Sequence, residues 1–134
     1  MKLQLKKTNT YSDSTGDLIP FYKKNSLKNF NIKRFFFVYG KKKYFRADHA
    51  HKKCSQLFIA ISGKMLLKVK TPTTSKAFII EEKNRYGVLV PPKYWCSIKF
   101  IKNKSILMVI NDRKYEFKDY LETFNSYKKY LQKK

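Results

Sequence analysis

The residues best suited to chemistry in this 134-residue sequence are its two histidines, His49 and His51. They stand one residue apart in the stretch RADHAHKK, close to Arg46 and Asp48. Residues two apart on a β-strand point to the same face, so the two imidazoles would lie side by side. Three interpretations are open: a pair of metal ligands, a pair of proton carriers, or two polar residues that satisfy hydrogen bonds on a strand.

A metal site is not favoured, because further ligands are missing. In the cupin metal pattern, HxH is followed after three or four residues by Glu, and a later His completes the set. Here Ser55 or Gln56 stands in place of the Glu, and Trp95 and Cys96 stand where a later histidine would come. Catalytic metals usually have at least three protein ligands. We therefore expect no metal and no other cofactor.

The charged neighbours of the pair favour proton transfer over a purely structural role. Arg46, Asp48 and Lys52 would be costly to direct inward without a charged ligand to meet them. A neutral imidazole is the side chain best suited to moving protons near neutral pH.

Short apolar runs between turn signals predict an all-β domain. They are rich in Phe, Ile, Val and Tyr, and they are separated by Gly40, the SGK and TPTTS stretches, Gly87 and PPK. Seven strands at this spacing indicate a β-sandwich or barrel. The expected strands are residues 32–39, 56–61, 65–69, 77–80, 88–90, 95–100 and 106–110.

The two ends of the chain have different patterns. From Phe117 to Gln132, apolar residues recur at intervals of three and four, which predicts one amphipathic C-terminal helix. The first 30 residues hold short, broken apolar pieces, which favours a strand and loop that dock late or on a neighbour. The length predicts a single domain over residues 1–134.

Composition narrows the function classes. The net charge of +22 is carried mainly by lysines spread along the whole chain, which favours a solvated surface over a focused nucleic-acid site. With four arginines, the bidentate contacts that read guanine are scarce. Cys54 and Cys96 are isolated, and neither a signal peptide nor a membrane-spanning stretch is evident. We expect a soluble, cytoplasmic protein that binds neither nucleic acid nor membrane.

Several stretches together resemble the cupin-fold dTDP-sugar 3,4-ketoisomerases, the small relatives of the WxcM C-terminal domain. The resemblance runs in order from about residue 10 to residue 130, and its most specific part is RADHAHK followed by the turn VPPKYW. The other matching stretches are DSTGDL (13–18), IKR (32–34), the SGK turn and Asp119-Tyr120. The resemblance implies a metal-free jelly roll, usually a homodimer that exchanges N-terminal strands.

The resemblance also implies a reaction. In this family dTDP-4-keto-6-deoxy-D-glucose is converted to a dTDP-3-keto-6-deoxyhexose, on the way to deoxyamino sugars of surface glycans such as lipopolysaccharide. The motif residues fall on His49, His51 and Arg46. We assign His49 to the proton transfer between carbons, His51 to the oxygens, and Arg46 to the enediolate charge or the diphosphate. For the product we expect the galacto (xylo-hex-3-ulose) form.

Other residues are expected to contact the substrate. Tyr94 and Trp95 could stack on thymine or pyranose, or could simply be core residues, and Lys52 could reach a phosphate. The full set of expected substrate-binding residues is Arg34, Tyr39, Lys52, Gln56, Tyr94 and Trp95.

Three positions depart from the family pattern. Ala47 stands where glycine is usual, Thr15 replaces a common arginine, and Phe37 stands where relatives often have tyrosine. If that tyrosine hydroxyl is needed, we expect Tyr39 or Tyr44 to replace it. Two alternative functions stay open: a dTDP-sugar 3,5-epimerase-like cupin, and a non-catalytic basic module that binds nucleotide or nucleic acid.

Overall fold

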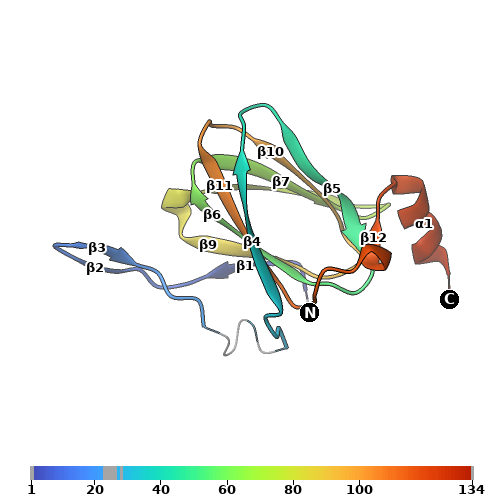
Figure 1. Cartoon of the computed structure of the whole chain (residues 1–134), viewed down its shortest axis with the longest axis horizontal. Coiled ribbons are helices and arrows are strands. Elements are labelled where there is room, and N and C mark those ends of the chain that lie inside the picture. The colour runs from blue at the N-terminus through green and yellow to red at the C-terminus, as the bar shows by residue number, and fades with distance from the viewer. Residues whose placement is uncertain (1, 23–26, 28, 134) are drawn as a thin grey trace.

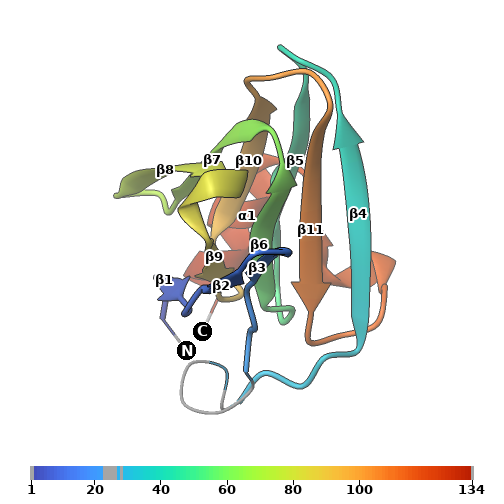
Figure 2. The same ribbon diagram turned by 90° about the vertical axis from the view of Figure 1, so that its left-hand side faces the viewer.

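The computed structural model of the chain describes residues 2–22, 27 and 29–133. In that part of the chain two five-stranded antiparallel sheets face each other, with strand orders β1-β9-β6-β11-β4 and β12-β5-β10-β7-β8 (Figure 1, Figure 2). A separate hairpin pairs β2 with β3. The strands are β1 (Gln4–Lys7), β2 (Tyr11–Asp13), β3 (Gly16–Leu18), β4 (Arg34–Gly40), β5 (Phe45–His51), β6 (Gln56–Ser62), β7 (Lys64–Lys70), β8 (Ser75–Glu81), β9 (Tyr86–Val90), β10 (Trp95–Phe100), β11 (Ser105–Asn111) and β12 (Tyr120–Leu121). The helices are η1 (Glu82–Asn84), η2 (Phe117–Asp119) and α1 (Phe124–Gln132).

The strand order of β4 to β11 is that of a jelly roll, as expected. Each of the seven strands predicted from apolar runs is present, as β4 and as β6 to β11. Their inward-facing side chains form the core between the sheets. This core includes Phe58 from β6, Leu67 from β7, Ile98 from β10 and Leu107 from β11, each of them buried.

The strand that carries the histidines, β5, was not among the apolar runs. The first half of β5 is mostly exposed and its last two residues are buried, so its sequence does not show the alternation of polar and apolar residues that marks a strand. Pairing with β10 on one side and with β12 on the other holds it in the sheet. The expectation that His49 and His51 lie on a strand is therefore confirmed.

The predicted C-terminal helix begins later than expected. Residues 117–121, which fit the helical period, form η2 and the short strand β12, which pairs with the end of β5. Helix α1 begins after Thr123, whose side chain accepts a hydrogen bond from the Ser126 N–H in a capping box. The pairing with β5 thus overrides the local helical pattern. Tyr127, fully buried, packs the helix against Trp95.

The N-terminal hairpin extends away from the two sheets, on the side opposite α1 (Figure 1). All residues of β2 and β3 are exposed, including Tyr11 and Leu18. By contrast, β1 pairs with β9 and so extends one of the sheets.

The outer face of the sheet that contains β4 is partly apolar and open. Phe35, Phe37 and Tyr39 alternate along β4 and are exposed, while Phe36 and Val38 between them face the core. In the described residues, no helix is long and apolar enough to cross a membrane.

Candidate active site

A β-bulge in β5 brings Arg46 and His49 to the same cavity. Three residues apart on a regular strand, these side chains would point to opposite faces. The pairing with β10 joins Cys96 to His49 and Ser97 to Ala47, so Asp48 is the extra residue of the bulge. Ala47 and Asp48 both have left-handed backbone conformations, with φ of 65° and 62°. Glycine is usual at this position of the family, and the positive φ of Ala47 is a conformation that glycine adopts more readily than an L-residue.

The bulge is held by a side-chain contact. The indole Nε1 of Trp95 donates a hydrogen bond to Asp48 Oδ1 at 3.0 Å. Trp95 is itself buried between β10 and α1, where it contacts Phe124 and Tyr127. Its observed surroundings are those of a core residue.

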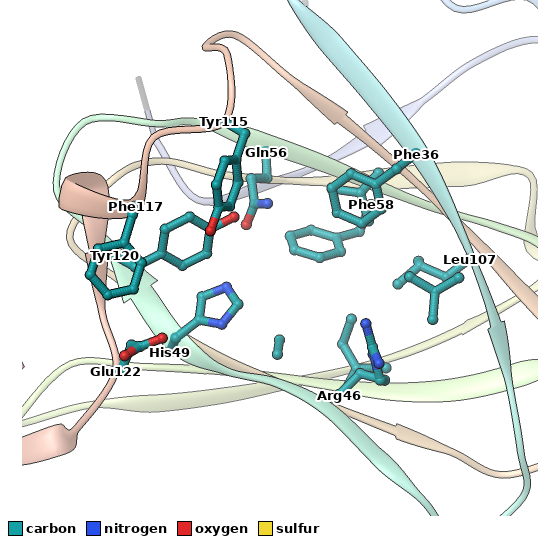
Figure 3. A pocket seen from close by; sticks show the side chains of 14 residues that line it. Phe36, Arg46, His49, Gln56, Phe58, Leu107, Tyr115, Phe117, Tyr120 and Glu122 are labelled. Atoms are coloured by element: carbon teal, nitrogen blue, oxygen red, sulfur yellow. The ribbon is translucent and has the colours of Figure 1, made fainter.

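The cavity has a volume of about 290 Å³ and is lined by residues from both sheets (Figure 3). Its apolar wall comes mainly from β4, β6, β10 and β11, and includes Phe36, Phe58 and Leu107. The polar groups that line it are the side chains of Arg46, His49, Gln56, Tyr115, Tyr120 and Glu122. A mostly apolar cavity with a few convergent polar groups is typical of a small-molecule site.

The two imidazoles are adjacent but differ in their access to the cavity. Their ring centroids are 5.0 Å apart and their planes are nearly perpendicular. His49 lines the cavity, whereas His51 is 5% exposed and lies outside the set of lining residues. Tyr120 packs against both rings, at 4.9 Å from His49 and 4.4 Å from His51.

His51 is held by a buried carboxylate. Its Nδ1 is 2.9 Å from Asp119 Oδ2, and the other oxygen of Asp119 accepts a hydrogen bond from the Lys53 N–H at 2.7 Å. A carboxylate accepts hydrogen bonds, so Nδ1 carries the proton and Nε2 presents its lone pair. That Nε2 atom is buried and has no partner among the described residues.

Both imidazoles are neutral at neutral pH. Burial lowers the pKa of His49 to about 4, and the neighbouring His51 adds to this shift. Burial also lowers the pKa of His51, although its hydrogen bond to Asp119 acts in the opposite direction. Neutral imidazoles can accept a proton, so the pair is suited to act as a base.

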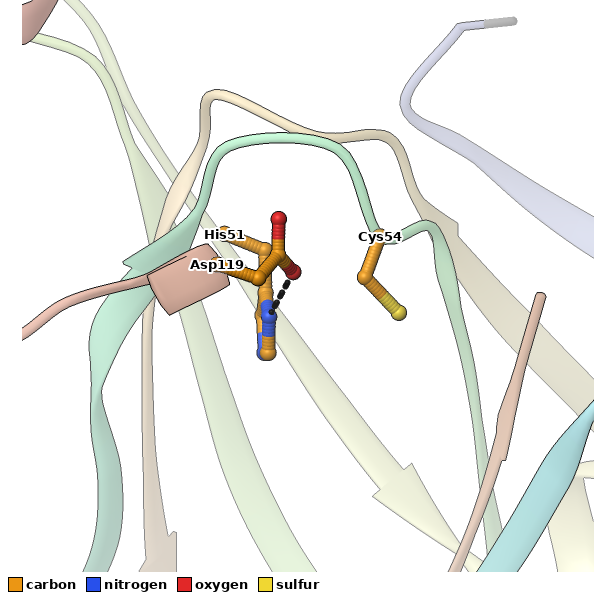
Figure 4. Close-up of side chains that lie close together, drawn as sticks. All are labelled: His51, Cys54 and Asp119. Carbon is orange, nitrogen blue, oxygen red and sulfur yellow. Dashed lines mark hydrogen bonds and ion pairs between the residues drawn. The ribbon is translucent and has the colours of Figure 1, made fainter. Parts of the chain in front are cut away.

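Three buried side chains, His51, Cys54 and Asp119, lie close enough together to be considered as metal ligands. Ligand atoms of His51, Cys54 and Asp119 lie within 4.8 Å of one another (Figure 4). Burial, reinforced by Asp112 and Asp119, raises the pKa of the Cys54 thiol to about 12, so the thiolate that a metal needs is disfavoured. Both oxygens of Asp119 already accept hydrogen bonds. The donor set therefore fits a metal poorly, and a metal-free reaction stays our prediction.

A family model described as "FdtA: WxcM-like, C-terminal" matches residues 1–132. The chain belongs to this family.

Relatives of this FdtA-type chain include named enzymes. It is 25% identical over 122 residues to a TDP-4-oxo-6-deoxy-alpha-D-glucose-3,4-oxoisomerase of Aneurinibacillus thermoaerophilus, which covers 90% of this chain and 86% of the relative. The crystal structure of QdtA, a sugar 3,4-ketoisomerase from Thermoanaerobacterium thermosaccharolyticum in complex with TDP, has 25% identity and a TM-score of 0.85, covering 93% of this chain and 90% of QdtA. A 3,4-ketoisomerase from Helicobacter canadensis shares the fold, with a TM-score of 0.90 at 19% identity, covering 99% of each chain.

Two of the six residues expected to bind substrate, Gln56 and Arg34, lie at or beside this cavity, as does Arg46. Gln56 lines it, and because its Nε2 donates to Asn111 Oδ1 at 2.9 Å, its amide oxygen is left for a ligand. Arg46, expected to bind charge, also lines it and has no ion-pair partner among the described residues. The Arg34 guanidinium stands 5.5 Å from the Phe36 ring and 5.6 Å from the Tyr115 ring, two lining residues, and its buried Nε has no partner in the described part of the chain.

Four other expected substrate residues lie elsewhere. Tyr39 is 76% exposed on the outer face of β4, and Trp95 is in the core behind the bulge. Tyr94 lines a separate pocket together with Leu3. The Lys52 ammonium group lies over the Tyr130 ring of α1. Lys52 lines a different pocket from that of His49, together with Asp119.

The structure also shows where Phe37 lies, the residue at the position where relatives often have tyrosine. Phe37 points to the outer face of β4, and Tyr44 is exposed as well, so neither side chain lines the cavity. The β4 aromatic in the cavity is Phe36, which has no hydroxyl.

Sequence reasoning missed the residues that the segment after β11 contributes. Tyr115, Phe117, Tyr120 and Glu122 all line the cavity, and Asp119 supports His51. Asp119-Tyr120 was part of the family resemblance, but neither residue was given a role, because this stretch was interpreted as helix. The match of Asp119-Tyr120 to the family was the signal in the sequence that could have identified these residues as part of the site.

Proposed function

We propose that the chain is a sugar-nucleotide 3,4-ketoisomerase that converts dTDP-4-keto-6-deoxyglucose to its 3-keto isomer. The observation that carries the proposal is a neutral imidazole, His49, lining an internal cavity, with the His51–Asp119 pair directly behind it. Moving a ketone from C4 to C3 needs a base at the carbons and a proton carrier at the oxygens, and no redox change. The TDP bound by QdtA and the name of the Aneurinibacillus relative support the substrate class.

Charge at the cavity supports an anionic substrate. Arg46 reaches the cavity from the bulge, and Arg34 lies beside it with an unpartnered buried Nε among the described residues. A guanidinium keeps its charge and can hold diphosphate or enediolate oxygens with paired hydrogen bonds. The net charge of +22 would further attract a nucleoside diphosphate sugar. The galacto configuration of the product stays a prediction, and a cytoplasmic location is part of the proposal, supported by the two unpaired cysteines.

Proton NMR tests the reaction directly. The purified protein is mixed with dTDP-4-keto-6-deoxyglucose in deuterated buffer. A 3-keto product, in which any deuterium taken up from solvent is at C4, is the expected result. Exchange at C5 instead would indicate an epimerase, and an unchanged sugar spectrum would indicate a protein that does not convert the sugar. Either outcome refutes the proposal.

A homodimer that exchanges N-terminal elements is also proposed. The β2–β3 hairpin exposes Tyr11 and Leu18, and an isolated two-stranded hairpin is marginally stable in water. The exposed aromatic row of β4 offers apolar surface that a second copy could cover. Because β1 pairs with β9 of its own chain, the hairpin is the element that we expect to be exchanged.

Light scattering tests the dimer. The wild-type protein is expected at twice the chain mass. The dimer fraction should increase at higher salt, because salt screens the repulsion between two strongly positive chains. Leu18→Asp should shift the protein to monomer, whereas Ile79→Asp, an exposed position on β8, should not. A wild-type monomer in all salt conditions would rule out the homodimer.

A further inference from the structure

The position of Tyr120 bears on how the oxygens of the substrate would exchange a proton. From the sequence we expected His51 to perform this task. In the structure, however, His51 is not among the residues that line the cavity and is only 5% exposed. Tyr120 lines the cavity, and its ring also contacts the ring of His51, with ring centroids 4.4 Å apart. Figure 3 shows Tyr120 beside His49, directed toward the cavity. A substrate in the cavity would therefore meet Tyr120 before it met His51.

Several independent contacts hold Tyr120 in this place. As part of β12 it pairs with His51 of β5, and its chain neighbour Asp119 binds the His51 ring. Its ring also contacts His49 at 4.9 Å and Tyr115 at 5.6 Å. These contacts leave the ring little freedom to turn, which is what a catalytic side chain requires.

We infer that Tyr120 is a catalytic residue whose hydroxyl carries the proton between the two substrate oxygens, while His51 and Asp119 act as positioning residues behind it. This inference rests on the proposed ketoisomerase function and adds to it a residue and a task. A phenol is suitable because its hydroxyl both donates and accepts a hydrogen bond.

The proton transfers balance without any other reactant. His49 removes the proton from C3, and the C3–H electrons form the C3=C4 bond while the C4 oxygen takes the proton of the Tyr120 hydroxyl. The resulting enediol then loses its O3 proton to the Tyr120 oxygen, and C3=O forms. The C3=C4 electrons take the proton from His49 at C4. Tyr120 and His49 both return to their starting states.

The other polar groups of the cavity are less suited to this task. Arg46 stays charged, and the Gln56 amide does not give up a proton under ordinary conditions. Glu122 is exposed on the chain segment after β12. Tyr115 is 62% exposed, and among the described residues its ring contacts are with Tyr120 and Arg34, so nothing holds its hydroxyl near His49.

The test compares Tyr120→Phe with Tyr44→Phe, a control at an exposed tyrosine outside the cavity, using the NMR assay. Tyr120→Phe keeps the ring contacts and removes the hydroxyl. We expect its kcat to fall by about 10²–10⁴-fold, the usual effect of losing a general acid or base, with TDP affinity within about threefold of wild type. Tyr44→Phe should keep kcat within about threefold, because its side chain lies outside the cavity.

Each outcome decides between the inference and the proposed function. If wild type does not isomerise the sugar, the proposed function fails. If wild type is active and Tyr120→Phe keeps its kcat, the inference fails alone. Should Tyr120→Phe not fold by circular dichroism, 3,5-difluorotyrosine at position 120 replaces it, since this analogue keeps the shape and acidifies the phenol. An unchanged pH–rate profile with the analogue would then refute the role of Tyr120.

Discussion

The left-handed backbone at Ala47 predicts that Ala47→Gly stabilises the protein. With φ of 65°, Ala47 is in a region that costs an L-residue about 1–2 kcal/mol and costs glycine almost nothing. Glycine also gives the unfolded chain more freedom, which offsets about 0.4–1 kcal/mol of that gain. The net stabilisation is then about 0.5–1 kcal/mol, or about 2–5 °C in Tm for a chain of this length.

The matched control is Ala77→Gly. Ala77 is exposed on β8 and is outside the positive-φ residues of the described chain. There glycine should lower stability by about 0.5–1 kcal/mol. Differential scanning calorimetry of both variants gives the answer. The same chemical change should thus move Tm in opposite directions, and a fall in Tm for both would refute the assignment of a left-handed bulge at Ala47.

Three further predictions concern the site. Asp119→Asn weakens the hydrogen bond to His51 Nδ1 and should lower kcat by about 10²–10⁴-fold with unchanged TDP affinity. The control Asp112→Asn also loses a charge but has no hydrogen bond to His51, so its kcat should fall far less. Equal losses of kcat in steady-state assays would contradict this prediction. Because the folded pKa of His49 is lowered to about 4, the unfolded chain binds more protons below about pH 6.5, so stability should fall as pH drops from about 6.5 to 4. Urea unfolding at pH 7 and pH 5 should show a loss of about 1–2 kcal/mol that His49→Gln reduces, and an equal loss in both proteins would argue against the lowered pKa. EDTA should leave turnover intact, and a loss of rate that added zinc restored would overturn the metal-free mechanism.

The sheet framework was predictable because it rests on local patterns. Strands such as residues 95–100 and 106–110 show the β-branched and aromatic runs that fit a buried pleated surface, and the turns between them contain Gly or Pro. The placement of His49 and His51 on one strand followed from their spacing. These features need no knowledge of distant residues.

The cavity lining was less predictable because it depends on contacts between distant segments. Arg46 and His49 share the cavity through a bulge that is defined by pairing with β10, and the alanine in place of the usual glycine at position 47 gave no sign of this bulge. Tyr120 fits a helical stripe in sequence, but its pairing with His51 makes it a strand residue. Tyr94 and Trp95 were expected to contact substrate because they are aromatic near a turn, a property that core residues share.

The central claim is that an imidazole inside the jelly roll performs the carbon proton transfers, and His49→Asn tests it most directly. The variant is mixed with dTDP-4-keto-6-deoxyglucose and followed by NMR, and its TDP affinity is measured by calorimetry. We expect turnover to be abolished while TDP binds within a few fold of the wild-type affinity. Full isomerase activity in His49→Asn would contradict the account.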